Sequence, residues 1–367
     1  PEQLPCTYVD AKDETEAAKI IFSRNAQHSH VRDASIMYAA FKIPAATIEA
    51  VVPQKNIEAW SENDNSITEQ LTAEEDDFEF EEGGIETDIV LGDLFEIGSH
   101  RLLCGDSTCS DSVERLMNGE KAELLFTSPP YSDIRTYEGG KDLSIEKLVE
   151  FIPTFLPYAE YQVVNLGIKR ENNEIVEYWQ SYINKAKQCG YKFLSWNIWN
   201  RENSGFSMAN ITSMFAIQHE WIFVFGKSRK ELNLTVENKN AGEFNDHSSN
   251  RQANGDIKKG KDITIRTHRQ LGTINTINNE QRREWTKYHP AIFPIELPSE
   301  YIKALTNEND LICEPFCGSG STMVAAHQLN RKCYGMELSE KYCQVIIDRM
   351  RKLDPTLIIK RNGVIYE

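Results

Sequence analysis

From about residue 89 onward, short apolar runs alternate with stretches that are apolar on one helical face. The runs AELLF (122–126), YQVVNLG (161–167), KFLSWNIWN (192–200) and EWIFVFGK (220–227) predict buried strands. The stretches DSVERLMNGE (111–120), LSIEKLVEFIPTFL (143–156) and EIVEYWQSYINKAKQCG (174–190) predict helices. Strands that alternate with helices are typical of an α/β protein with a doubly wound, mostly parallel sheet.

The same alternation returns near the C-terminus. ELPSEYIKAL predicts a helix, LIC a strand, TMVAAHQL a helix, CYGMEL a strand and SEKYCQVIIDRMRKL a final helix. A glycine-rich turn, EPFCGSGST, lies between that first strand and the helix after it. We therefore assign residues 89–367 to one large domain.

Three segments lack this pattern. Residues 1–60 carry a few apolar residues at helical spacing and predict a small N-terminal segment. Residues 61–88 are acidic and contain Gly-Gly, which predicts a solvated linker. Residues 228–288 are rich in Asn, Gly, Lys and Arg, which predicts loops or an inserted module.

Charge is distributed unevenly along the 367 residues, whose formal net charge is −16. Residues 1–95 hold 6 Lys/Arg and 21 Asp/Glu, whereas the rest of the chain holds 34 and 35. Residues 228–288 are locally basic, with 12 Lys/Arg against 8 Asp/Glu, so this segment could hold phosphate groups despite the acidic total.

The eight cysteines form no CxxC pair, which argues against a zinc site or a disulfide framework and favours a reducing, cytoplasmic location. No apolar run approaches the roughly 20 residues that a membrane helix needs.

The rigid turn Ser128-Pro129-Pro130-Tyr131 follows the predicted strand AELLF directly. Pro cannot continue a central strand or a helix interior, and its fixed φ aims the neighbouring carbonyls. Such a turn presents the Ser128 hydroxyl, the Pro129 carbonyl and the Tyr131 ring at the end of the strand. Taken alone, the four residues are more typical of a turn that only ends a strand and whose aromatic ring packs.

In the glycine-rich turn, Gly318 and Gly320 would let the backbone approach a ligand closely. The turn lacks the third glycine of the dinucleotide fingerprint and the lysine of a P-loop. Glu337 ends the next predicted strand, where an acid in doubly wound folds binds ribose hydroxyls. A turn that serves packing alone is the alternative for the glycines.

TSPPY and EPFCGSGST together resemble the signatures of the DNA amino-methyltransferases, which use S-adenosylmethionine. Their order along the chain resembles the beta group of these enzymes, whose target-recognition region lies between the two halves. LLCGDST resembles the family segment whose acid reaches the cofactor adenine, and HPAIFPIELPSEYI resembles the segment that lines its methionine end. The resemblance implies cofactor contacts at Asp106, His289, Glu314, Phe316, Gly318, Gly320, Thr322 and Glu337.

The resemblance also implies the reaction, which is methyl transfer to an exocyclic amine of a base taken out of the duplex. In the family, SPPY usually accompanies cytosine N4 and DPPY adenine N6, so Ser128 favours cytosine N4, with adenine N6 as the alternative. Methylation at cytosine C5 needs a Cys nucleophile, and the only Pro-Cys pair, Pro5-Cys6, lies outside the predicted domain. A catalytically silent DNA-binding module with the same fold is the alternative from another class.

Double-stranded DNA is the implied partner, and the basic segment 228–288 is the expected target-recognition region. Our candidate DNA contacts are Arg135, Arg251, Lys258, Lys259, Lys261, Arg266, Arg269 and Arg282. A solvated loop, or an internal ion pair for Arg135, is the alternative. A cognate restriction endonuclease and homodimerisation stay open. The reaction requires no metal. Residues 5–27 faintly resemble the end of a ParB-like nuclease domain.

Overall fold

A computed structural model describes residues 71–78, 85–130, 144–172, 174–201, 215, 217–242, 244–245, 249–251, 256–259, 263–278 and 293–367. The predicted N-terminal segment 1–60 lies outside these residues. The chain divides into two units. One comprises 71–238 and 268–367 and contains the whole predicted active site, and the other comprises 1–70 and 239–267.

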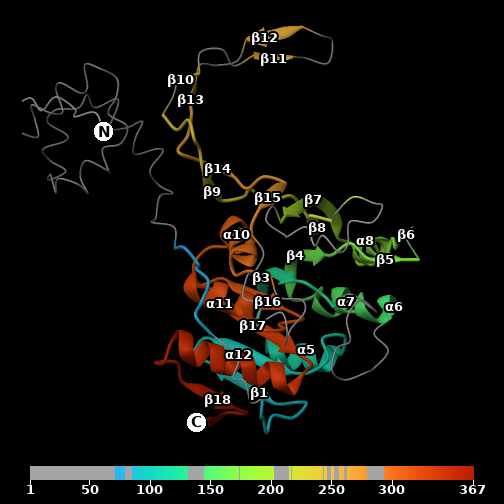
Figure 1. The fold of residues 1–367 in the computed structure, drawn as a ribbon, viewed down its shortest axis with the longest axis vertical. Helices are drawn as coiled ribbons and strands as arrows, with labels where there is room; N and C mark the ends of the chain where they lie inside the picture. Colours follow the sequence, from blue (N-terminus) through green and yellow to red (C-terminus); the bar gives the residue numbers. More distant parts are fainter. Residues whose placement is uncertain are drawn as a thin grey trace, which may run out of the picture. The chain divides into compact units, whose positions relative to one another are not determined.

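An 11-stranded sheet dominates the first unit, in the order β15-β7-β8-β4-β3-β16-β17-β2-β1-β18-β19 (Figure 1). Its five central strands are parallel, from β4 through β3, β16 and β17 to β2. The flanking pairs β4–β8, β7–β8 and β2–β1 are antiparallel, and β15 pairs parallel with β7. The strands are β1 Leu94–Ile97, β2 His100–Cys104, β3 Ala122–Thr127, β4 Ala159–Leu166, β7 Lys192–Asn200, β8 His219–Gly226, β15 Ile274–Thr276, β16 Leu311–Glu314, β17 Lys332–Glu337, β18 Ile359–Arg361 and β19 Val364–Ile365.

Helices cover both faces of this sheet, which confirms the doubly wound α/β fold. They are α5 Ser110–Met117, α6 Ile145–Leu148, α7 Phe151–Phe155, α8 Trp179–Gln188, α10 Glu296–Leu305, α11 Ser321–Gln328 and α12 Glu340–Leu353.

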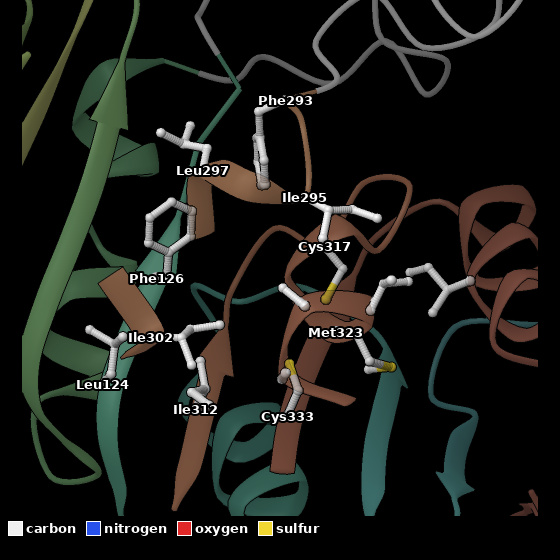
Figure 2. Packing of buried hydrophobic residues seen from close by; sticks show 14 of the residues in the cluster. Leu124, Phe126, Phe293, Ile295, Leu297, Ile302, Ile312, Cys317, Met323 and Cys333 are labelled. Carbon is white, nitrogen blue, oxygen red and sulfur yellow. The ribbon is translucent and has the colours of Figure 1, made fainter. Parts of the chain in front are cut away.

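Side chains alternate between the faces along the central strands, as the period of two requires. On β3, Leu124 and Phe126 join the core under α10–α12, whereas Leu125 joins the core under α5, α7 and α8. Figure 2 shows the first of these cores, with Phe126 near Leu297 of α10.

Two predicted helices are shorter than expected. The stretch 143–156 forms two short helices, α6 and α7, with a break at Val149–Glu150. Pro153 explains the break, because its ring would clash with the Val149 carbonyl in a continuous helix. In the stretch 174–190, the helix α8 begins only at Trp179, because Glu174–Ile175 (β6) pairs with Arg170–Glu171 (β5).

Part of the acidic segment is attached to the sheet-containing unit, although four of the residues 71–78 are exposed. Leu71 and Ala73 pack against the core under α10–α12, and the Asp76 carboxylate forms an ion pair with Arg349 of α12 at 2.5 Å. Both side chains are nearly fully buried, with exposed fractions of 5% for Asp76 and 1% for Arg349. The predicted linker boundary stays untested, but residues 71–78 are attached to the sheet-containing unit.

Within 228–288, where we expected loops or an inserted module, the described residues form short antiparallel pairs. In the first unit, β9 (Leu234–Glu237) pairs with β14 (His268–Gln270). In the second unit, β10 (Phe244–Asn245) pairs with β13 (Ile263–Thr264), and β11 (Ser249–Arg251) pairs with β12 (Ile257–Lys259).

Candidate active site

The parallel strands bring the predicted site residues to one edge of the sheet. Neighbouring parallel strands end at the same edge, so the residues that follow them lie side by side. Ser128 follows β3, Glu314 ends β16, Glu337 ends β17 and Asp106 lies just beyond β2. Segments that are more than 200 residues apart in the sequence therefore meet at the carboxyl edge, where doubly wound folds bind ligands.

The glycine-rich turn joins β16 to α11. Gly318 and Gly320 have φ of +52° and +87°, in the left-handed region that favours glycine. Gly320 also precedes α11 as its N-cap. A Cβ at Gly320 would lie 3.1 Å from Ile346 Cγ1, so the backbone conformation favours glycine and a larger residue would also have to displace Ile346 slightly.

Glu314 lies beneath this turn and is 1% exposed. Its carboxyl group accepts hydrogen bonds from Thr322 Oγ1 at 2.5 Å and from the Phe316 amide at 3.4 Å. Burial raises the pKa of Glu314 to about 8, against the lowering effect of the hydrogen bonds from Thr322 and from the Phe316 amide. Glu314 therefore stabilises the glycine-rich turn through hydrogen bonds from the protein interior.

Glu337 holds the turn from the neighbouring strand. Its carboxylate accepts hydrogen bonds from the Gly318 amide at 2.7 Å and from the Ser339 amide at 2.9 Å. Burial raises the pKa of Glu337 to about 7, although these hydrogen bonds oppose the rise. Glu337 is only partly buried, so its carboxylate can also meet a ligand in the turn.

Asp106 stays ionised at the end of β2. Burial alone would raise its pKa, but hydrogen bonds from the Thr108 hydroxyl (2.7 Å) and amide (2.9 Å), together with Lys147 at 3.4 Å, lower the pKa below its ordinary value. Phe316 packs edge-on against Phe151, with ring centroids 5.4 Å apart. The edge thus presents two carboxylates and an aromatic ring around a glycine turn.

Ser128 is the first residue of the rigid turn. Its hydroxyl donates to Asn165 Oδ1 at 3.1 Å, and the amide nitrogen of Asn165 donates to the Trp221 carbonyl of β8 at 3.2 Å. Pro129 and Pro130 follow, while Tyr131 and Arg135 lie outside the described residues, as does His289.

The candidate DNA contacts are only partly described. Arg266 and Arg269 lie on different units, and both are exposed. Strand β11 contains Arg251, and strand β12 contains Lys258 and Lys259. Lys261 and Arg282 lie outside the described residues. Whether these residues form one DNA-binding surface therefore stays a prediction.

Sequence reasoning missed two buried polar residues of the site, Asn165 and Arg349. Arg349 Nη1 donates to the Ser319 carbonyl in the glycine-rich turn at 2.9 Å. Both residues had a signal in the sequence, because each is a polar side chain at a position whose periodic neighbours are apolar. No motif drew attention to either one.

No group of three or more His, Cys, Asp and Glu side chains in the described part of the chain could hold a metal ion. No helix among the described residues is both long and apolar enough to cross a membrane.

A family model described as DNA methylase matches residues 122–348, more than half of the chain. The chain therefore belongs to this family, whose members are amino-methyltransferases of the N4 and N6 types.

Among curated proteins, the chain is similar to the orphan methyltransferase M.BamHII of Bacillus amyloliquefaciens, with 28% identity over 244 residues that cover 62% of this chain and 88% of that protein. It is also similar to the type II methyltransferase M.ScaI of Streptomyces caespitosus, with 26% identity over 262 residues, or 65% and 79% of the two chains.

Among solved structures, PvuII DNA methyltransferase (cytosine-N4-specific) matches with a TM-score of 0.45 and 18% identity, covering 70% of this chain and 92% of that chain. An M1.HpyAVI–SAM complex matches with a TM-score of 0.45 and 19% identity, covering 68% and 98%. Both scores are low, so the description of the fold rests on the sheet itself.

Proposed function

We propose that this chain is a DNA methyltransferase that moves a methyl group from S-adenosylmethionine to the exocyclic N4 of cytosine. One observation carries the proposal. The Ser128-Pro129 turn and the glycine-rich turn end two hydrogen-bonded parallel strands, β3 and β16, at the same edge of the sheet. An amine acceptor and a nucleoside-binding turn thus lie beside each other, as methyl transfer to an amine requires.

The residues at this edge fit S-adenosylmethionine. The positive-φ turn at Gly318–Gly320 lets the backbone approach a ligand, and the Glu337 carboxylate can accept hydrogen bonds from ribose hydroxyls. Asp106, ionised at the end of β2, can accept from the amino group of the adenine. Bound there, S-adenosylmethionine supplies an electrophilic methyl group.

The chain's own contribution is to make the amine nucleophilic. The lone pair of an exocyclic amine is conjugated into the base ring, so the nitrogen attacks poorly. Hydrogen bonds from the amine hydrogens to Ser128 Oγ and to the Pro129 carbonyl favour a geometry in which the lone pair is free. The fixed φ of Pro129 and Pro130 keeps these acceptors in place, and small misplacement costs rate.

Ser128 supports cytosine over adenine, on the family pattern in which SPPY accompanies N4. In this proposal, Tyr131 stacks on a target base that has left the duplex. The basic residues of 228–288 bind phosphates and read base edges. Type II relatives such as M.ScaI make a restriction partner a further part of the proposal, whereas M.BamHII is described as an orphan.

The test is methyl transfer from labelled S-adenosylmethionine to mixed-sequence DNA, followed by mass spectrometry of the nucleosides. N4-methylcytosine is the expected product. N6-methyladenine would keep the fold and the chemistry but reject the proposed base. Absence of any methylated nucleoside, with cofactor binding intact by calorimetry, would favour the silent DNA-binding module.

A further inference from the structure

Ser128 is one end of a short hydrogen-bonded chain that crosses three strands. Its hydroxyl meets Asn165 Oδ1 at the end of β4, and Asn165 Nδ2 meets the Trp221 carbonyl on β8. Strand β4 lies between β3 and β8 in the sheet. Asn165 is 1% exposed, whereas Ser128 is only partly buried, so the chain runs from the candidate site into the protein interior.

The direction of each hydrogen bond in this chain is fixed by chemistry. A backbone carbonyl can only accept, so the Trp221 oxygen must face the NH₂ group of Asn165. The amide oxygen of Asn165 then faces Ser128. An amide oxygen can also only accept, so the Ser128 hydroxyl must donate its single hydrogen to Asn165.

We propose that Asn165 is a positioning residue that makes Ser128 a hydrogen-bond acceptor toward the target amine. A serine hydroxyl can rotate and either donate or accept, and a donating Ser128 would compete for the lone pair that must attack the methyl group. Anchored on the Trp221 carbonyl, Asn165 takes the hydroxyl hydrogen, and the Ser128 oxygen then offers lone pairs to the amine. This inference rests on the proposed amine methylation, but it holds for cytosine N4 and adenine N6 alike.

The same geometry makes Asn165 selective for the residue at position 128. A carboxylate there would place a second acceptor against Asn165 Oδ1, at the site of the present 3.1 Å hydrogen bond. Asn165 could not turn its NH₂ group to meet it without placing its oxygen against the Trp221 carbonyl. Asn165 is therefore matched to Ser rather than to Asp at this position.

The test replaces Asn165 with Leu, which has a similar size and no polar atoms. We expect kcat to fall by about 100-fold, since the Asn165 amide oxygen then no longer holds the hydrogen of the Ser128 hydroxyl away from the target amine. Calorimetric affinity for S-adenosylmethionine and KM for the cofactor should stay unchanged, because Asn165 lies outside the glycine-rich turn.

Gln162→Leu is the matched control. Gln162 is also a buried amide on β4, but it donates to the Ile152 carbonyl and the Tyr191 hydroxyl, away from Ser128. It should lower the melting temperature without the selective loss of kcat. Equal losses of kcat in both variants, at matched melting temperature, would assign Asn165 a structural role only.

A double-mutant cycle provides the decisive readout. In a Ser128→Ala background, Asn165→Leu should lower kcat no further, because there is no hydroxyl left to orient. If the double variant instead loses kcat by the product of the two single losses, the inference is overturned. Should Asn165→Leu fail to fold, Asn165→Ala, which only removes atoms, takes its place in the cycle. A wild-type protein that methylates no DNA would instead reject the proposed function itself, before any variant is compared.

Discussion

Two carboxyl groups of the site, Glu314 and Glu337, hold their protons at unusually high pH. Burial raises the pKa of Glu314 to about 8 and that of Glu337 to about 7. They differ in access, because Glu314 is 1% exposed whereas Glu337 is only partly buried. At the residue scale, Glu314 therefore stabilises the turn from the interior, whereas we propose that the more accessible Glu337 also binds the cofactor.

Cofactor binding should release a proton near pH 7. Ribose hydroxyls that donate to Glu337 favour its charged form and lower its pKa, so affinity should rise as the pH rises from 6 to 8. Calorimetry at pH 7 in two buffers of different ionisation enthalpy measures this proton. Glu337→Gln should bind roughly 10- to 100-fold more weakly, with no proton released. Affinity that is independent of pH in the wild type would contradict the ribose contact.

The contiguous motifs were visible in the sequence because each places several unusual residues in a row, as in Ser128–Tyr131. Asn165 could not be recognised in the sequence, because it is a single polar residue inside an apolar run. Its hydrogen-bond partner, Ser128, lies 37 positions away. Nothing in one sequence says which strands are neighbours, so no pattern could join Asn165 to Ser128 before β3 and β4 were known to pair.

At the scale of elements, the segment 71–78 is part of the cofactor turn's support. Asp76 binds Arg349, and Arg349 in turn donates to the Ser319 carbonyl in the turn. Glu75 adds a second attachment, because its carboxylate accepts from the Ile295 amide at 2.5 Å, just before α10. Composition alone suggested a solvated spacer, since a run of acids gives no sign of a buried arginine far along the chain.

Asp76→Asn should therefore weaken cofactor binding, although Asp76 lies outside the motifs. Removing the charge leaves Arg349 buried with a neutral partner, which is strongly unfavourable, and loosens its hold on Ser319. We expect a lower melting temperature and a several-fold rise in the calorimetric Kd for S-adenosylmethionine.

The adjacent residue supplies the control. Asp77 faces Lys352 at 3.4 Å but is 89% exposed, so Asp77→Asn should leave both quantities nearly unchanged. Equal effects of the two substitutions would show that acidity in the segment matters rather than the buried pair.

The main elements were predictable from apolar periodicity, and the errors have local causes. Pro153 divides one predicted helix, and the β5–β6 hairpin shortens another. The C-terminal pair β18–β19 was not foreseen, because its few residues carry too little pattern. The sequence predicted the class of sheet but not the order of its strands, because strand pairing depends on contacts between residues that are far apart in the chain.

At the scale of the whole molecule, stability should depend on pH through Glu314. Its pKa in the folded state, about 8, exceeds its ordinary value of 4.5, so the fold binds a proton that the unfolded chain has lost. The stabilisation is fully present below pH 4.5 and is lost as the pH rises through about 8.

The melting temperature of the cofactor-free protein should accordingly fall between pH 6.5 and 8.5. Glu314→Gln, which cannot ionise, should show a smaller fall over the same interval. Calorimetric melts at four or five pH values measure both. Parallel curves for the two proteins would mean that Glu314 is already ionised at neutral pH.

The pairing of β9 with β14 has a consequence for how such a protein can change over generations. The chain leaves the sheet-containing unit after Asn238 and returns at His268, and these two points border a single antiparallel pair. Residues 239–267 are thus spliced in at one place, without interrupting any of the five central strands. In the proposed function this segment holds part of the target-recognition region, so its exchange between relatives would change recognition while the proposed methyl-transfer edge stays intact.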